Sequence, residues 1–164
     1  MNSVYDLKFS VLMSVYINEK PKYLEMSINS ILNQNLLPNE FVIVKDGPLT
    51  KELNVLLEDY AKKSSIIKLI EIKENVGLGK ALNEGLKYCS YDYVARMDSD
   101  DISLEDRFEK QISYMKNHSE CDVIGGNIME FDDKSGKNIS IRKVPVDNSS
   151  ILSFFKKRNP MNHV

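Results

Sequence analysis

The densest group of residues able to do chemistry is a run of acids in the middle of the chain. A short apolar segment ends at position 97 and is followed by three aspartates, Asp98, Asp100 and Asp101. Carboxylates this close repel one another, and a bound divalent cation would relieve that repulsion. Asp98 and Asp100 are two positions apart, so in an extended segment both side chains point to one side. Arg96 shares that side and could compensate the charge when no metal is bound.

The residues around the acidic run narrow the roles that it can have. Aspartates are favoured at helix N-termini, so the run could cap the helix expected from Leu104. Glu109 stands where a calcium-binding loop ends, but Ile102 and Ser103 occupy positions where that loop needs a ligand and a glycine, which excludes it. A phosphatase of the haloacid-dehalogenase type also has two aspartates after a strand, but close to the N-terminus, and it fits less well. The metal site and the helix cap both stay open.

Polar residues also follow the other apolar segments. Ser14 and Tyr16 close a first β-branched run, and Asp46 follows a second. A glycine comes directly after Asp46, so that pair could be no more than a turn. The segment Asn75–Gly85 is rich in glycine and opens a helix, an arrangement that allows close backbone approach and favours an anion. A plain loop with a cap is the alternative, because the P-loop pattern is not met.

These candidates are positioned by strands alternating with helices. Runs typical of strands cover residues 9–15, 40–45, 66–72, 91–97, 123–131 and 139–144. Apolar residues at helical spacing cover residues 22–33, 50–60, 79–89, 104–117 and 148–157. The alternation predicts right-handed βαβ units, and hence an α/β fold with a central, mostly parallel sheet flanked by helices. Ligands bind such sheets at the carboxyl ends of the strands, where all the candidates stand.

Composition sets the outer limits. The chain has 164 residues and a net charge of −2, which suggests one domain and gives no electrostatic case for nucleic acid or an anionic membrane as the main partner. No apolar run approaches the roughly 20 residues of a membrane helix, and no signal peptide is expected. Cys89 and Cys121 form neither a disulfide framework nor a zinc site. We expect a cytoplasmic protein.

Together these segments resemble the family 2 glycosyltransferases, inverting enzymes with the GT-A nucleotide-sugar fold. The similarity is strongest to the branch that builds bacterial exopolysaccharide, capsule or O-antigen repeat units. It spans nearly the whole chain, and each motif is specific only in combination with the others. The matching segments are the first strand into Val15–Tyr16, then Val44–Gly47, Asn75–Gly85, Ala95–Asp101, and Asn159–Pro160 with His163.

The resemblance implies a nucleotide pocket for a nucleotide-sugar donor, with UDP-sugars expected. Ser14, Tyr16 and Asn75 would line this pocket, and Asp46 would hydrogen-bond the uracil ring. Asp98 would contact the ribose or the surroundings of the metal. Asp100 would bind Mg²⁺ or Mn²⁺ as part of a DXD motif, and the metal would bridge the diphosphate.

The resemblance also implies a second half. An inverting transfer needs a general base to deprotonate the acceptor hydroxyl, and in this family that carboxylate follows the Asn-Pro segment by some tens of residues. We therefore expect the base beyond Val164, and residues 1–164 to be a single nucleotide-sugar-binding domain without the acceptor part. The acceptor would be a saccharide or a lipid-linked saccharide, at the inner face of the membrane. Apolar surface left uncovered would favour self-association. By the resemblance, a lipid-linked acceptor would bring the protein into peripheral contact with the membrane.

Two further classes of protein stay open. A non-catalytic nucleotide-sugar-binding module on the same scaffold would also lack the base. A sugar nucleotidyltransferase can share a similar sheet, but it needs a glycine-rich loop after the first strand, and residues 14–20 contain no glycine.

Overall fold

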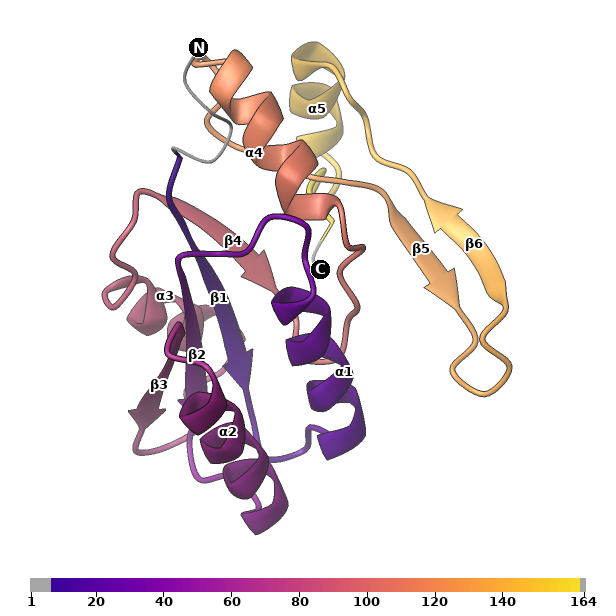
Figure 1. Ribbon diagram of the computed structural model, residues 1–164. Coiled ribbons are helices and arrows are strands. Elements are labelled where there is room, and N and C mark those ends of the chain that lie inside the picture. Colours follow the sequence, from indigo (N-terminus) through magenta and orange to yellow (C-terminus); the bar gives the residue numbers. More distant parts are fainter. Residues whose placement is uncertain (1–6, 163–164) are drawn as a thin grey trace. The chain divides into compact units, whose positions relative to one another are not determined.

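The computed structural model describes residues 7–162, which form two compact units (Figure 1). The first unit is Met1–Asn117 and the second is His118–Val164, and each is described by itself. Within the described range, no helix combines the length and the apolar character needed to cross a membrane.

The first unit is built on a four-stranded parallel sheet with the order β3-β2-β1-β4. Its strands are β1 (Phe9–Val15), β2 (Glu40–Asp46), β3 (Ile67–Ile72) and β4 (Tyr93–Met97). β1 pairs with both β2 and β4, so it lies inside the sheet. The chain moves away from β1 in one direction to β2 and β3, and then crosses to β4 on the other side. That reversal makes the carboxyl ends of β1 and β4 the topological switch point of the sheet, where such folds bind ligands.

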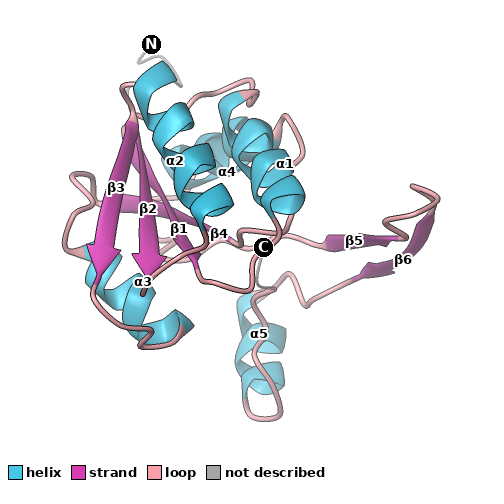
Figure 2. Cartoon of the chain, turned by 90° about the horizontal axis from the view of Figure 1, so that it is seen from below, coloured by secondary structure: helices cyan, strands magenta, loops and turns pink. Residues whose placement is uncertain are grey.

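Helices cover both faces of this sheet (Figure 2). They are α1 (Pro21–Leu32), α2 (Lys51–Lys63), α3 (Leu78–Leu86) and α4 (Arg107–Asn117). The larger core joins alternate strand residues such as Val11 and Ile43 to α1, α2 and α4. The other strand residues, such as Leu12 and Val44, pack on α3. The strands are therefore apolar on both faces, as parallel strands under two helical layers must be. Thr50 caps α2, because its hydroxyl accepts from Leu53 N at 3.2 Å.

The second unit differs from the expected pattern. Its strands, β5 (Ile128–Phe131) and β6 (Asn138–Arg142), do not extend the parallel sheet but pair with each other in antiparallel orientation. The physical reason is the connection, because the six residues between them suffice for a hairpin but not for a crossover. β5 is also shorter than predicted and begins at Ile128 rather than at Val123. The helix α5 (Asn148–Phe155) follows the hairpin.

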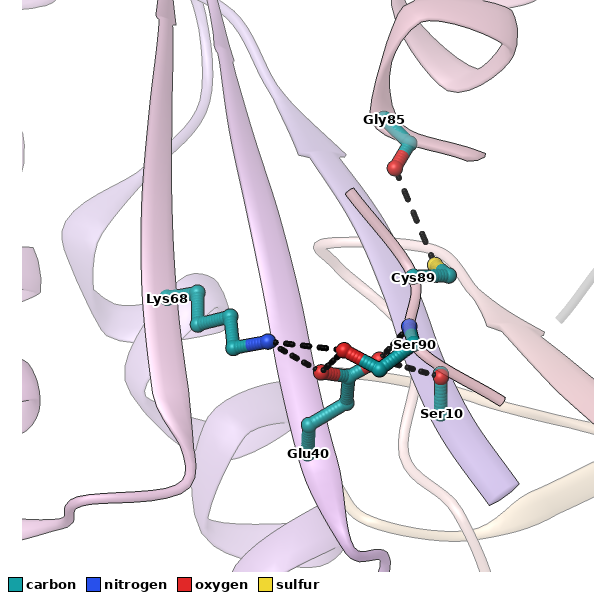
Figure 3. Close-up of polar contacts among 6 residues, drawn as sticks. All are labelled: Ser10, Glu40, Lys68, Gly85, Cys89 and Ser90. Atoms are coloured by element: carbon teal, nitrogen blue, oxygen red, sulfur yellow. Dashed lines mark hydrogen bonds and ion pairs between the residues drawn. The ribbon is translucent and has the colours of Figure 1, made fainter. Parts of the chain in front are cut away.

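A buried carboxylate ties the amino ends of three strands together (Figure 3). Glu40, which opens β2, is 3% exposed and accepts hydrogen bonds from Ser10 of β1, Lys68 of β3 and both the amide and hydroxyl of Ser90. Burial opposes ionisation of this group, but the hydrogen bonds outweigh it and lower its pKa to about 2 from 4.5. The cluster lies at the end of the sheet opposite to the candidate site, so its role is structural.

We expect Glu40→Gln to lower the free energy of unfolding by about 2 kcal/mol at neutral pH, because it removes a buried charge from several donors at once. A carboxylate whose pKa is lowered by folding stabilises above its unfolded pKa and loses that effect as pH falls through its folded pKa. The difference between the two proteins should therefore shrink from pH 4.5 towards about 2. Urea unfolding across this range measures it. Glu84→Gln, which removes the exposed partner of Lys87, is the control and should cost no more than about 0.5 kcal/mol. Equal losses for both variants would contradict the role of the cluster.

Candidate nucleotide and metal site

All six residues predicted to form the site belong to the first unit and lie at or after the carboxyl ends of its strands. Ser14 and Tyr16 come from the end of β1, Asp46 from the end of β2, and Asn75 from the loop after β3. Asp98 and Asp100 follow β4. Since β1 lies between β2 and β4, the segment around Tyr16 stands between the Asp46 side and the acidic side of the edge. Ser14 is buried in β1, and the Tyr16 side chain is exposed.

Asp46 and Asn75 are brought into direct contact. The Asp46 carboxylate is 3% exposed and accepts from Val76 N at 2.8 Å, from Gly77 N at 3.1 Å and from Asn75 Nδ2 at 3.2 Å. Asn75 Nδ2 also lies 3.3 Å from the Asp46 carbonyl oxygen. A carboxylate offers about four acceptor positions, and these contacts use three of them. Asp46 thus holds the loop that leads into α3 in position. The sequence did not predict this role, because it indicated only that Asp46 follows a strand.

Gly47 makes this contact possible. Its φ is +83°, a value that side-chain-bearing residues rarely adopt, and a Cβ there would lie 2.6 Å from the backbone nitrogen of Asn75. The loops after β2 and β3 therefore touch through their backbones. Asp46 ends β2, and the chain bends at Gly47, where it contacts the loop after β3.

The acidic run is held in place by its neighbours. Asp98 forms an ion pair with Arg96, which confirms the predicted charge compensation. Asp100 is exposed, and Asp101 is partly buried. Burial, and then the charges of Asp100 and Asp98, raise the pKa of Asp101 to about 6 from 3.8. The helix-cap interpretation is wrong, since α4 begins only at Arg107.

Polar side chains on α1 and just beyond its end form hydrogen bonds with the backbone of this acidic segment and of the residues that follow it. The Ser27 hydroxyl donates to the Asp98 carbonyl at 2.8 Å, and the Ser30 hydroxyl accepts from Ser103 N at 3.0 Å. Gln34, one helical repeat further on, donates to the Leu104 carbonyl at 2.7 Å. These side chains occupy positions 27, 30 and 34, which share one side of the helix and its extension. Sequence reasoning missed these residues, although polar residues at helical spacing among apolar ones were a usable signal.

A second tie joins the segments that follow β1 and β4. The Ser99 hydroxyl donates to the Glu19 carboxylate, and Glu19 N donates to the Tyr16 carbonyl at 3.1 Å. Ser99, which lies between Asp98 and Asp100 in the sequence, is buried. Glu19 therefore connects the Tyr16 segment to the acidic run, a role that the sequence did not indicate.

The donor chemistry of the acidic run suits a hard divalent cation. Carboxylate oxygens are the ligands that Mg²⁺ and Mn²⁺ prefer, and the raised pKa of Asp101 reflects burial together with a local excess of negative charge. Among residues 7–162, no three His, Cys, Asp or Glu side chains are gathered closely enough to hold a metal by themselves. The residues fit a divalent cation to which the protein would supply one or two oxygens.

Carboxylates elsewhere serve local structure. Asp132 accepts from Ser135 within the hairpin turn, and Asp147 caps α5 by accepting from Ser150 N at 2.9 Å. Hydrogen bonds from Ser149 and Ser150 lower the pKa of Asp147 to about 2, which makes it a poor base. His163, which carried part of the resemblance, lies outside the described residues.

The chain belongs to the glycosyl transferase family 2, whose sequence profile matches residues 10–163. It is 42% identical over 156 residues to the amylovoran biosynthesis glycosyltransferase AmsE of Erwinia amylovora, covering 95% of this chain and 58% of that protein. It is 39% identical over 156 residues to the Escherichia coli UDP-Gal:alpha-D-GlcNAc-diphosphoundecaprenol beta-1,3-galactosyltransferase, covering 95% of this chain and 56% of that one. The chain therefore spans less than two thirds of the length of these relatives.

Solved structures agree with the fold. Staphylococcus aureus TarS in complex with UDP-GlcNAc has a TM-score of 0.60 and 29% identity, covering 69% of this chain and 32% of the TarS chain. A second structure is that of the Pyrobaculum calidifontis mannosyltransferase PcManGT in complex with GDP-Man and Mn²⁺. It has a TM-score of 0.60 at 19% identity, and the match covers 80% of this chain and 38% of the PcManGT chain. The predicted α/β architecture of the GT-A type is confirmed.

Proposed function

We propose that this chain is the donor-binding part of an inverting glycosyltransferase that uses a UDP-sugar in surface polysaccharide synthesis. One observation carries the proposal. The Asp46–Asn75 contact and the acidic run at Asp98–Asp100 flank Tyr16 at a single edge of a parallel sheet. On one side, that edge offers a polar group that can bind the nucleobase of the donor. On the other side, it offers carboxylates that can bind a metal.

Two relatives support a uridine nucleotide. The E. coli relative carries UDP-Gal in its name, and TarS was solved with UDP-GlcNAc. In the proposed complex, Tyr16, Ser14 and Asn75 line the nucleoside pocket, and the remaining acceptor position of Asp46 takes the uracil N–H. The sugar itself is selected by contacts that these residues do not define.

The proposed cofactor is Mg²⁺ or Mn²⁺, held by Asp100 with Asp98 beside it as the DXD pair. When bound, such a metal would supply positive charge to stabilise the departing nucleoside diphosphate. Other residues of the chain hold the proposed metal ligands in position. Arg96 orients the Asp98 carboxylate, and Ser27 holds the Asp98 carbonyl, so both aspartates follow a fixed backbone.

The acceptor, the location and the general base are proposals as well. We propose a saccharide or lipid-linked acceptor, a cytoplasmic location at the inner face of the membrane, and a general base beyond Val164, since Asp132 and Asp147 are engaged locally. Self-association is also proposed. Its surface is the exposed apolar side of the β5–β6 hairpin, and sedimentation velocity measures it. The exposed residues there are Met129, Phe131, Ile139 and Ile141.

Thermal unfolding with a panel of nucleotides tests the function. A ligand at one hundred times its Kd stabilises the native state by about 2.7 kcal/mol, which corresponds to roughly 5–10 °C in Tm for a chain of this size. We expect UDP and UDP-sugars with Mn²⁺ to raise Tm by such an amount, and GDP, CDP or EDTA-treated samples to raise it far less. A sugar nucleotidyltransferase would instead respond to a nucleoside triphosphate. A transfer assay on the longer protein separates an enzyme from a non-catalytic binding module.

A further inference from the structure

The helix α5 differs from the other helices in what it buries. Each of α1 to α4 has at least two buried residues, whereas α5 has none. Its Leu152 and Phe155 are 60% and 68% exposed. They are three residues apart, so they lie on the same side of the helix. This side is an apolar surface with no cover among the described residues of its own unit.

The apolar side ends in a cluster of positive charge. Lys156, Lys157 and Arg158 follow Phe155 directly, and all three are exposed. Lys156 stands four residues after Leu152, on the same side of the chain. The Arg158 guanidinium lies 5.5 Å from the centre of the Phe154 ring, so that charge is held close to the helix. No acid occurs in residues 148–162 to neutralise the cluster.

We propose that α5 and its basic end, residues 151–158, form a docking surface for an anionic lipid bilayer. Apolar side chains that enter the interface, next to Lys and Arg that reach the headgroups, are what such a surface requires. The flexible stems of Lys156 and Lys157 allow the ammonium groups to stay at headgroup level while Phe155 inserts. Exposed apolar residues alone would fit many kinds of partner. The basic residues next to them, with no acid in residues 148–162, favour a partner that is negatively charged.

This surface goes beyond the donor chemistry and uses none of its residues. The net charge of −2 for the whole chain conceals it, because the three cations are local and the acids lie elsewhere in the sequence. Its function would be to hold the protein at the membrane.

Co-sedimentation with vesicles tests the proposal. The chain should bind vesicles of phosphatidylcholine and phosphatidylglycerol mixed in equal parts, and should not bind pure phosphatidylcholine. Each cation near an anionic membrane surface strengthens binding to it. Removing two of them in Lys156→Gln/Lys157→Gln should therefore weaken partitioning into the vesicles about thirtyfold. Phe155→Ser should also weaken it while leaving the salt dependence unchanged. All of these positions are exposed, so folding should be retained, and far-ultraviolet circular dichroism verifies it.

The matched control is Lys62→Gln/Lys63→Gln, which removes two exposed cations from the last turn of α2. It should leave vesicle binding within about twofold of the parent chain, because these cations have no apolar surface beside them to insert. The proposal is overturned if the parent chain does not sediment with anionic vesicles, or if both double variants lose the same amount. It is also overturned if sedimentation velocity shows a dimer that Phe155→Ser disrupts while no vesicle binding occurs, because the face would then join two copies. UDP binding stays intact in every arm, so this result is separate from the donor site.

Discussion

Replacing Asp100 by Asn should weaken metal-dependent UDP binding at least about a hundredfold, the scale on which loss of a metal ligand or its direct support is felt. Asp100 is the exposed carboxylate of the acidic run, while Asp98 is already paired with Arg96. An amide in its place keeps the shape but removes the negative charge that a cation needs. Calorimetric titration of UDP in the presence of Mn²⁺ measures the change.

The control is Asp106→Asn, which removes another carboxylate close by in the chain that is paired with Lys110. UDP affinity should then change less than about twofold, because an exposed ion pair of this kind contributes little. Stability offers a second readout, because Asp100→Asn relieves repulsion on Asp101 and should leave the protein at least as stable as the parent. UDP binding that is unchanged by Asp100→Asn would refute the metal assignment.

Asp46→Asn should lose both stability and nucleotide affinity. The carboxylate accepts from Val76 N, Gly77 N and Asn75 Nδ2 through its two oxygens. An amide has one oxygen, so its NH₂ group must face a donor and leave at least one buried N–H without a partner. We expect a loss of about 3 kcal/mol in the free energy of unfolding, because hydrogen bonds to a charged acceptor are among the stronger ones. Urea unfolding measures the stability, and calorimetric titration with UDP measures the affinity.

Two further variants separate positioning from contact. Asn75→Ala removes only one of the three donors and should cost about 1 kcal/mol. Asp59→Asn, on the exposed side of α2, should cost almost nothing. If Asp46 only positions the loop, UDP affinity follows stability across the series. If Asp46 also contacts uracil, Asp46→Asn loses more affinity than its stability loss explains. Full stability and affinity in Asp46→Asn would contradict both roles.

The strands and helices of the first unit were predictable because their signals are local. Apolar runs such as Phe9–Val15 are long enough to be recognised as buried parallel strands, and the cap at Thr50 depends on a residue three positions away. The candidate residues were predictable for the same reason, since each lies at or soon after the end of a strand. The Arg96–Asp98 pair joins residues two positions apart.

What the sequence did not indicate depends on contacts between distant segments. Ser27 reaches Asp98 across 71 positions, and Asp46 reaches the Val76 amide across 30. Serine on a helix carries no sign of its partner, and the burial that makes these polar groups informative exists only in the folded chain. The hairpin differs from the first unit in the connection between its strands. Its strands resembled those of the first unit in composition, and only the short turn between them distinguishes antiparallel pairing from a crossover.

The most direct test of the central claim is calorimetric titration of UDP into the purified chain, with Mn²⁺ and then with EDTA. The proposed site predicts binding of one UDP per chain that requires the metal and that Asp100→Asn removes. Binding of equal strength in EDTA, or no binding of UDP under either condition, would contradict a metal-assisted nucleotide-sugar site at the edge formed by Tyr16, Asp46 and Asp100.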